Sequence, residues 1–406
     1  MSQRHFLFLQ GLPGPSLRLI AKRLAAEGHR VTRVNLNGGD WLDWRGGGTN
    51  FRGTLGQWPA WLGALCHRER VSDLVLFGET RPAHIAAAEV AAELGLDLHV
   101  LEEGYLRPNS VTLEYWPRGA GWEPPASLEE CRARIAAHGV AGEEVPQRNY
   151  FRRRMAEAIA YWLATAVLRP VWPHYRSHRH LGWWREATGW IGRWLRRPLA
   201  MRRSAAALAR LEARRFFLLP LQLDGDAQIR YRSPYDNFLE AVDLVTADFA
   251  AHAPADTLLL VKRHPLDPDI EDWRAIVTAC AARHGASERV LYIEYGDLDA
   301  LLPRAEGVVT VNSTVGSLAL REGKPVHILG TAIYGLDGLV DRRPLQAFWS
   351  APQPPAPDGY ATFAAALRAE CLINAGFHSA PGLERLAKGA ARRILARSSD
   401  CSGRAP

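Results

Sequence analysis

The sequence has little cysteine and no long hydrophobic run, and each deficit excludes a class of protein. Its five cysteines are odd in number, lie far apart and form no Cys-x-x-Cys pair, which argues against a disulfide framework or a zinc site and fits a reducing compartment. They are Cys66, Cys131, Cys280, Cys371 and Cys401. No apolar stretch reaches the roughly 18 to 20 residues that a membrane span needs. The longest candidate, residues 155–168, is shorter and carries Glu157.

Targeting and catalytic signatures are also missing. The N-terminal stretch MSQRHFLFLQGLPGPS has an apolar core of only a few residues, without the apolar region and cleavage site of a signal peptide. FLFLQG instead predicts a buried first strand. The chain contains no Walker motif and no GxGxxG, HExxH or GxSxG. We therefore expect a cytoplasmic protein whose chemistry depends on less familiar patterns.

What is present is the composition of a large globular protein with excess positive charge. The 406 residues are 47% hydrophobic and 23% charged, enough for two ordinary domains. The formal net charge is +7 and the isoelectric point about 9.3. This excess indicates an anionic partner: nucleic acid, anionic lipid or a phosphorylated substrate.

Strand and helix patterns alternate through the first 120 residues. We expect strands at 5–11, 29–39, 72–79 and 96–104 and helices at 15–28, 58–70 and 82–95. This order predicts a parallel sheet built from βαβ units, in which ligands bind beyond the carboxyl ends of the strands. The candidate substrate or catalytic residues at these ends are Gln10, Gly11, Asn37, Asp40, Glu102, Glu103 and Arg107.

A second strand–helix alternation begins at residue 215. It includes a helix in SPYDNFLEAVDLVTADFAAHAP, with Ser233 as a plausible N-cap before Pro234. By analogy, two Rossmann-like domains facing a cleft make a GT-B-like α/β glycosyltransferase architecture. The expected divisions are an N-terminal domain at 1–120, a connector and helical insert at 121–214, a nucleotide-sugar domain at 215–345 and C-terminal helices at 346–406.

The insert is rich in arginine and tryptophan. Residues 152–215 contain fifteen arginines and six tryptophans but only three glutamates. One interpretation is an amphipathic helical segment with tryptophan in the core and arginine in solvent. The other is a patch for an anionic membrane surface, because arginine attracts headgroups and tryptophan prefers the interface. RNA-binding signatures are absent, so no nucleic acid is expected. His174, His178 and His180 are interpreted as surface residues, with no metal.

Three motifs of the second half could carry chemistry. In VVTVNSTVGSLAL a strand leads into a helix, whose N-terminus, with Asn312, Ser313, Thr314 and Gly316, could bind an anion or could simply be capped. In LLLVKRHPLDP, His264 precedes Pro265 and follows Lys262, and it could bind a phosphate or protonate a leaving group. In LQLDGDAQIR, Asp224 and Asp226 flank Gly225 and form either an acidic turn or a catalytic carboxylate opposite Glu102 and Glu103.

Taken together, the motifs resemble a known family. The order FLQG, NGGD, LFGETRP, EEGYLRP, LQLDGDAQIR, KRHPLDP, VVTVNSTVG and GKPVHILG is similar to the capsule polysaccharide synthesis family of retaining β-Kdo glycosyltransferases, and most of all to its shorter, single-module members. Kdo is 3-deoxy-D-manno-octulosonic acid. The resemblance covers roughly residues 5 to 115 and 215 to 350 and leaves the arginine/tryptophan insert outside.

The resemblance implies a reaction and residue roles. Kdo would pass from CMP-Kdo, with retention, to a lysophosphatidylglycerol-type lipid and begin the poly-Kdo linker of a capsule. Asp226, which closes a Gln-x-x-x-Asp motif with Gln222, would be the nucleophile, with Asp224 as the weaker alternative. Glu103 or Glu102 could be the acid/base group, its pKa raised by its neighbour.

The donor phosphate would be held by His264, Ser313, Thr314 and the helix N-terminus, with no metal or other cofactor needed. A lipid acceptor would place the protein at the anionic inner-membrane surface, peripherally bound and in contact with other capsule assembly proteins. Two alternatives stay open. One is a GT-B transferase that uses another CMP-sugar, such as a sialic acid, and the other is a non-enzymatic scaffold of capsule export.

Overall fold

In a computed structural model, the chain divides into two compact α/β units. The structure describes residues 3–106, 110–139, 145–146, 150–177, 183–212, 214–223, 234–235 and 237–399. Unit 1 comprises Met1–Glu123, His138–His178 and Leu367–Pro406, and unit 2 comprises Pro124–Ala137 and Arg179–Ala366. Each unit contains its own parallel-dominated sheet, which confirms the prediction of two Rossmann-like domains.

The sheet of unit 1 has the strand order β12-β6-β5-β4-β1-β2-β3. The strands are β1 (His5–Phe8), β2 (Arg30–Asn35), β3 (Thr49–Asn50), β4 (Asp73–Phe77), β5 (Asp97–Glu103), β6 (Val111–Trp116) and β12 (Leu372–Ile373). From β3 to β5 all neighbours pair in parallel. Both β6 and β12 pair antiparallel, which the sequence interpretation did not anticipate.

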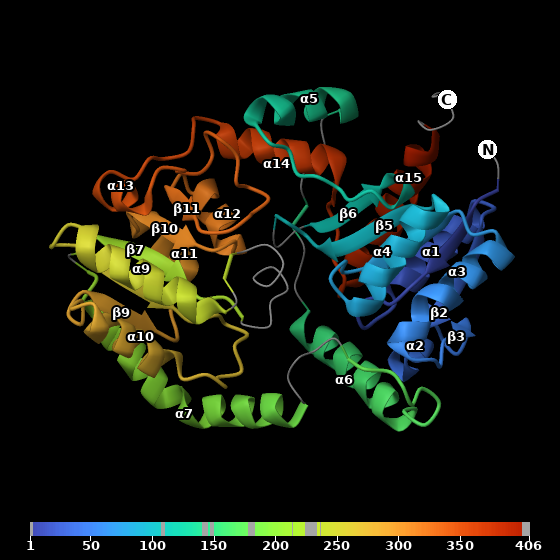
Figure 1. The fold of residues 1–406 in the computed structure, drawn as a ribbon, viewed down its shortest axis with the longest axis horizontal. Helices are drawn as coiled ribbons and strands as arrows, with labels where there is room; N and C mark the ends of the chain where they lie inside the picture. Colours follow the sequence, from blue (N-terminus) through green and yellow to red (C-terminus); the bar gives the residue numbers. More distant parts are fainter. Residues whose placement is uncertain are drawn as a thin grey trace. The chain divides into compact units, whose positions relative to one another are not determined.

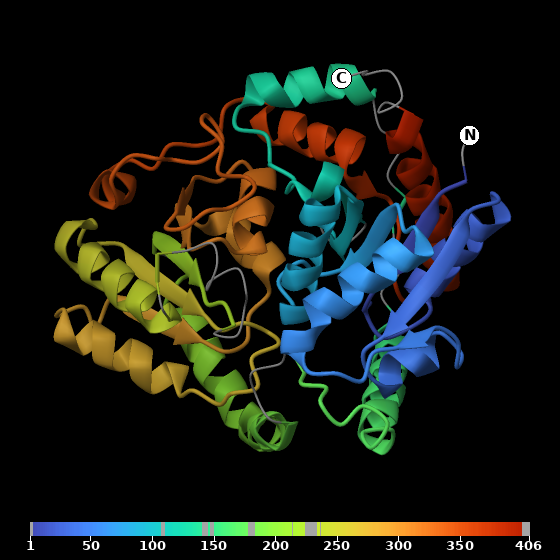
Figure 2. The same ribbon diagram turned by 45° about the vertical axis from the view of Figure 1, so that its right-hand side comes forward.

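Alternation along β1 divides the core of unit 1 between two faces of its sheet. Leu7 and Leu9 face the layer of α3 and α4, which pack side by side (Figures 1 and 2), whereas Phe6 and Phe8 face α1 and α15. The helices of this unit are α1 (Ser16–Ala26), α2 (Gly38–Asp43), η1 (Leu55–Gln57), α3 (Trp58–Glu69), α4 (Pro82–Leu94), η2 (Pro117–Gly119), α6 (Phe151–Val167) and α15 (Ala380–Ser399). The chain's last described helix therefore completes the first unit.

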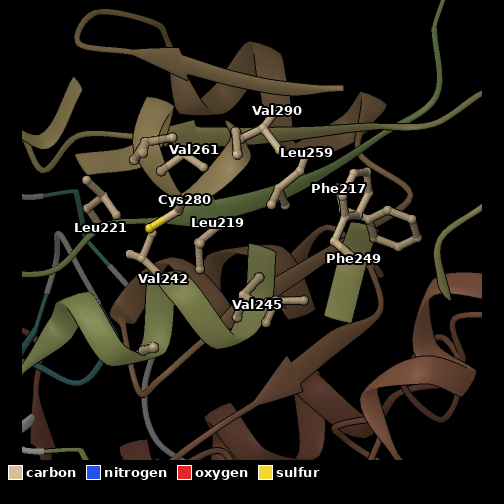
Figure 3. Packing of buried hydrophobic residues seen from close by; sticks show 14 of the residues in the cluster. Phe217, Leu219, Leu221, Val242, Val245, Phe249, Leu259, Val261, Cys280 and Val290 are labelled. Atoms are coloured by element: carbon tan, nitrogen blue, oxygen red, sulfur yellow. The ribbon is translucent and has the colours of Figure 1, made fainter. Parts of the chain in front are cut away.

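Unit 2 has an entirely parallel sheet in the order β11-β10-β7-β8-β9. Its strands are β7 (Phe216–Pro220), β8 (Leu258–Lys262), β9 (Val290–Ile293), β10 (Gly307–Thr310) and β11 (Val326–Ile328). Its helices are α5 (Leu128–His138), α7 (Trp183–Ala209), α9 (Phe238–His252), α10 (Trp273–Arg283), α11 (Leu298–Leu301), η3 (Leu302–Arg304), α12 (Thr314–Arg321), α13 (Leu345–Ser350) and α14 (Gly359–Glu370), the last of which continues into unit 1. Figure 3 shows Val242 and Val245 of α9 packed toward Leu219 of β7.

Two details differ from the sequence interpretation. Helix α9 begins at Phe238, with the side chain of Asn237 accepting a hydrogen bond from the Glu240 amide, so Ser233 is not its cap. The predicted insert 121–214 is divided, because α6 belongs to unit 1 and α7 to unit 2. Within the described residues, no helix is long and apolar enough to cross a membrane.

Candidate active site

The NGGD loop of unit 1 is a docking point for helix α6. Asp40 is fully buried and forms an ion pair with Arg33, Nη2 to Oδ1 at 2.9 Å. It also accepts a hydrogen bond from the Tyr161 hydroxyl at 3.0 Å, and Asn37 donates to the same hydroxyl at 2.9 Å. A buried carboxylate is tolerated only with such partners. Asn37 and Asp40, predicted as substrate contacts, thus have a structural role, and their contact with substrate stays a prediction.

The two glycines between them permit this docking. A Cβ on Gly38 would collide with the carbonyl oxygen of Ala164, and one on Gly39 would enter the Tyr161 ring. Gln10, predicted beside this loop, donates from Nε2 to the hydroxyls of Tyr161 and Tyr175, at 3.0 and 3.2 Å. Hydrogen bonds therefore join the end of β1, the NGGD loop and α6 into one network.

The two glutamates at the end of β5 have different surroundings. Successive residues of a strand face opposite sides of the sheet. Glu103 points to α6, where its carboxylate forms an ion pair with Arg154 at 3.1 Å. Glu102 points into the protein, close to Gly78 and Arg81. The sequence left the choice between them open, and the environments now separate them.

Burial raises the pKa of Glu102 to about 8, and the negative charges of Glu114 and Glu79 add to the rise. The expectation that the adjacent Glu103 causes the shift is wrong, because its side chain lies on the other face of the strand. Glu114 is the diagonal neighbour across β5 and β6, since it pairs with Val100. At neutral pH, Glu102 is therefore protonated and can donate a proton.

The turn after β5 is held by the rest of its motif. A Cβ on Gly104 would collide with the backbone carbonyl of Ser110, so only glycine fits. The Tyr105 hydroxyl donates to the Glu114 carboxylate, and Trp116 Nε1 donates to the same carboxylate at 2.8 Å. These two bonds satisfy Glu114 and fix the negative charge that acts on Glu102.

In unit 2 the ends of β7 and β10 are joined by a pair of predicted site residues. Gln222 Nε2 donates to Asn312 Oδ1 at 2.8 Å, and the backbone N–H of Asn312 donates to Gln222 Oε1 at 3.2 Å. The two motifs therefore meet at the carboxyl edge of the sheet, where a Rossmann-like fold binds its ligands.

The helix that follows Asn312 is capped internally. The Ser313 hydroxyl accepts from the Val315 amide at 3.2 Å, and the Gly316 amide donates to the Ser313 carbonyl at 3.0 Å. A Cβ on Gly316 would collide with the Tyr334 hydroxyl, so the absence of a side chain here makes room for Tyr334, and the predicted ligand contact stays a prediction. Thr314 is exposed at the first helical position and keeps its hydroxyl and amide at the helix N-terminus.

The loop after β8 is fixed by the basic helix α7. Arg193 donates to the carbonyls of Pro265 and Asp267 at 2.7 and 2.6 Å, and Arg196 forms an ion pair with Asp269 at 2.5 Å. These two arginines of the insert are therefore structural. Within the loop, the Leu266 amide donates to Nδ1 of His264 at 3.1 Å.

Lys262 lies just before this loop. Its side chain is buried, and burial together with the charges of Arg193 and Arg263 lowers its pKa. Basic side chains thus cluster at the end of β8, where the sequence predicted a phosphate, although Arg263 is paired with Asp269 and Glu294.

Three predicted site residues, Arg107, Asp224 and Asp226, lie outside the described residues. Conversely, the sequence interpretation missed Asp43 at the end of α2. Burial raises its pKa to about 7, and its Oδ2 accepts a hydrogen bond from the Gly14 amide at 3.0 Å. The only signal was its position three residues after Asp40, which had already been selected.

Comparisons of the sequence with known proteins identify one family. The family model described as capsule polysaccharide biosynthesis protein matches residues 72–378. The chain is 30% identical to the capsule polysaccharide export protein KpsS of Escherichia coli, over 93% of this chain and 98% of that protein. It is also 30% identical to the capsule polysaccharide modification protein LipB of Neisseria meningitidis, over 87% of each chain. Among solved structures, KpsC of Thermosulfurimonas dismutans, a beta Kdo 2,7 transferase, aligns over 98% of this chain and all of that one, at 14% identity and a TM-score of 0.47.

Proposed function

The chain belongs to the capsule polysaccharide biosynthesis family, and from that premise we propose that it is a retaining β-Kdo transferase. It moves Kdo from CMP-Kdo to a lysophosphatidylglycerol-type lipid and so begins the poly-Kdo linker of a capsule, together with other capsule assembly proteins. Beside family membership, the proposal is supported by Glu102, a carboxyl at the end of a central strand whose pKa burial raises to about 8. Carboxyl groups with a raised pKa cluster at functional sites, which favours an enzyme over a scaffold.

The mechanism consists of two displacements at the anomeric carbon of Kdo. In the first, a carboxylate oxygen of Asp226 bonds to this carbon as the bond to the CMP phosphate breaks, and Glu102 gives its proton to the departing phosphate oxygen. In the second, Glu102 takes the proton of the acceptor hydroxyl while that oxygen displaces Asp226. Two inversions give net retention, and both enzyme groups return to their first state.

Unit 2 supplies the groups for the donor phosphate. Thr314 at the N-terminus of α12, Lys262 at the end of β8 and the ring of His264 would stabilise the leaving CMP by hydrogen bonds and positive charge. Charge stabilisation of this kind does the work that a metal ion does in other transferases.

A donor comparison tests the proposal. The purified protein is incubated with a fluorescent lysophosphatidylglycerol and either CMP-Kdo, generated in situ, or CMP-N-acetylneuraminic acid. We expect mass spectrometry to show a lipid that has gained one Kdo residue with the first donor and no product with the second. Product from the sialic acid donor alone would identify a different CMP-sugar. No product and no CMP release with either donor would favour a scaffold.

Helix α6 supports a membrane location for this reaction. Phe151, Met155, Ile159, Leu163 and Val167 follow one another every four residues, and each is 43 to 67% exposed. The opposite side of the helix carries Tyr161 and packs on α2. An exposed apolar stripe flanked by arginines is typical of a helix lying in the interface of an anionic bilayer. We propose that α6 binds the cytoplasmic face of the membrane in this way.

Charged substitutions in this stripe should release the protein from lipid. The double variant Ile159→Asp and Leu163→Asp is expected to bind vesicles of phosphatidylglycerol and phosphatidylcholine at least about tenfold more weakly, since burying each side chain contributes about 1.5 to 3 kcal/mol. Co-sedimentation with the vesicles measures the change in affinity. The matched control is Leu239→Asp and Leu244→Asp on α9, two leucines that are each 43% exposed. Equal loss in both variants would refute the role of α6.

A further inference from the structure

Unit 1 contains a pocket that the predicted site residues barely touch. Its volume is about 640 Å3, and only Gln10 of the predicted residues lines it. The walls come from three segments: the loop at 51–58, the start of α4 at 81–83 and the segment at 169–177 that follows α6. All three belong to the same unit. A pocket of this size takes a small organic ligand.

The lining has charge of one sign. Arg52, Arg81, Arg169 and Arg176 line it with His174, and the lining includes no aspartate or glutamate. Within the described part of the chain, none of the four arginines forms an ion pair. Arg81 is the deepest: its Nη1 donates to the Gly11 carbonyl at 3.0 Å, and its guanidinium lies over the Phe77 ring. Four guanidinium groups around one pocket without a carboxylate indicate an anionic ligand, and arginine suits phosphate in particular.

Much of the rest of the lining is apolar or aromatic, with Gln10, Thr54 and Ser177 as polar members. Trp172 is buried, with its Nε1 donating to the Asn35 carbonyl, and the rings of Phe51 and Trp58 pack edge to face with their centroids 5.0 Å apart. A fully hydrated anion such as free phosphate gains nothing from these walls. A phosphate ester with carbon groups on both sides does, because its glycerol carbons cover the aromatic faces.

The position of the pocket relative to α6 supplies the second part of the ligand. The exposed apolar stripe of α6 ends at Val167, and the pocket-lining residue Arg169 follows two residues later. A molecule with an acyl chain along the stripe would therefore bring a phosphate attached to that chain to the arginines. This is the chemistry of a lysophospholipid.

The pocket is also connected to Glu102. Arg81 Nε and Glu102 Oε1 lie 3.5 and 3.7 Å from the position that a Cβ on Gly78 would occupy. The positive charge of Arg81 acts on Glu102 strongly enough to oppose part of the rise in its pKa. An acceptor whose phosphate binds Arg81 would thus place its glycerol hydroxyl beside the acid/base group.

We propose that this pocket binds the phosphodiester of the lysophospholipid acceptor, with Arg81, Arg169 and Arg176 as its phosphate ligands. The identity of the acceptor rests on the proposed function. The anionic character of the pocket's ligand does not, because it follows from the lining alone.

Two exposed arginines allow a test that spares the fold. The variant Arg169→Gln and Arg176→Gln is compared with Lys22→Gln and Arg23→Gln, which removes two exposed charges of α1 in the same unit. Binding of glycerophosphoglycerol, the headgroup without an acyl chain, is measured by calorimetry, with inorganic phosphate as the second probe. We expect headgroup binding to weaken at least tenfold in the pocket variant and less than twofold in the control. Headgroup binding that is unchanged in the pocket variant would overturn the proposal. Inorganic phosphate binding as tightly as the headgroup would overturn the lipid assignment.

Steady-state kinetics separate this inference from the proposed function. In the pocket variant, KM for lysophosphatidylglycerol should rise at least tenfold, while kcat and the slow hydrolysis of CMP-Kdo without acceptor stay within twofold of wild type. Wild-type transfer with an unchanged KM in the variant would refute the pocket and leave the transferase in place. Arginine-dependent headgroup binding without any transfer would refute the transferase and leave the pocket in place.

Discussion

Replacement of Glu102 by glutamine is expected to lower kcat roughly 10²- to 10⁴-fold, the usual contribution of a general acid/base group. Glutamine keeps the shape of the side chain and its hydrogen-bond acceptor but cannot exchange a proton. Product formation at saturating CMP-Kdo and lysophosphatidylglycerol measures the loss. KM should change little, because Glu102 is assigned to proton transfer rather than to binding.

The same substitution should make the protein more stable at high pH. In the folded protein the pKa of Glu102 is about 8, whereas in the unfolded chain it is near the ordinary value of 4.5. Between these values the folded state binds a proton that the unfolded state does not, so the free energy of unfolding falls as pH rises. Glutamine does not titrate, so the free energy of unfolding of the variant does not fall for this reason. The melting temperature of Glu102→Gln should equal that of wild type near pH 5 and exceed it above pH 8.

Glu103→Gln is the matched control, since it alters the neighbouring carboxylate by the same few atoms. It removes an ion pair with Arg154 at a partly exposed site, and such pairs contribute about 0 to 1 kcal/mol. We expect kcat within about threefold of wild type. A large loss of kcat in Glu103→Gln, with normal turnover in Glu102→Gln, would reverse the assignment.

This pair also shows what the sequence could and could not predict. Strand alternation predicts that Glu102 and Glu103 face opposite sides, and the βαβ pattern places them at the ligand-binding edge of the sheet. Which side is buried depends on β6 and its Glu114, and β6 was not predicted. Its six residues pair with β5 through a turn that only Gly104 allows, and a short strand of this kind has no distinctive periodicity.

Long-range packing explains the other differences. Helix α15 was expected in a separate C-terminal region, yet it packs on α1, more than 350 residues away in the chain. Local periodicity predicts that such a helix exists and which side is apolar, but not which partner covers that side. The same holds for Asp40 and Gly316. Their residue types suited a ligand site, whereas their partners, Tyr161 and Tyr334, come from distant segments that no local pattern identifies.

Asp226→Ala is expected to abolish transfer, with a loss of roughly 10⁴-fold or more, because a double displacement has no first step without its nucleophile. Intact-mass spectrometry offers a direct readout. Wild-type protein incubated with CMP-Kdo and no acceptor should gain the mass of one Kdo residue, and the variant should not. Peptide mapping should place the adduct at Asp226.

Asp224→Ala is the control, since the two aspartates flank Gly225 and differ only in their place relative to Gln222. The mechanism requires that Asp224→Ala still form the adduct and transfer Kdo. Combining Glu102→Gln with wild-type Asp226 sharpens the test: with no base to activate the acceptor, any adduct that forms should persist when lysophosphatidylglycerol is added. An adduct on Asp224 would identify Asp224, and not Asp226, as the nucleophile. Retained transfer in both aspartate variants would exclude a covalent intermediate at this loop. Retention of configuration would then have to arise from a single displacement, in which the acceptor attacks from the face that CMP leaves.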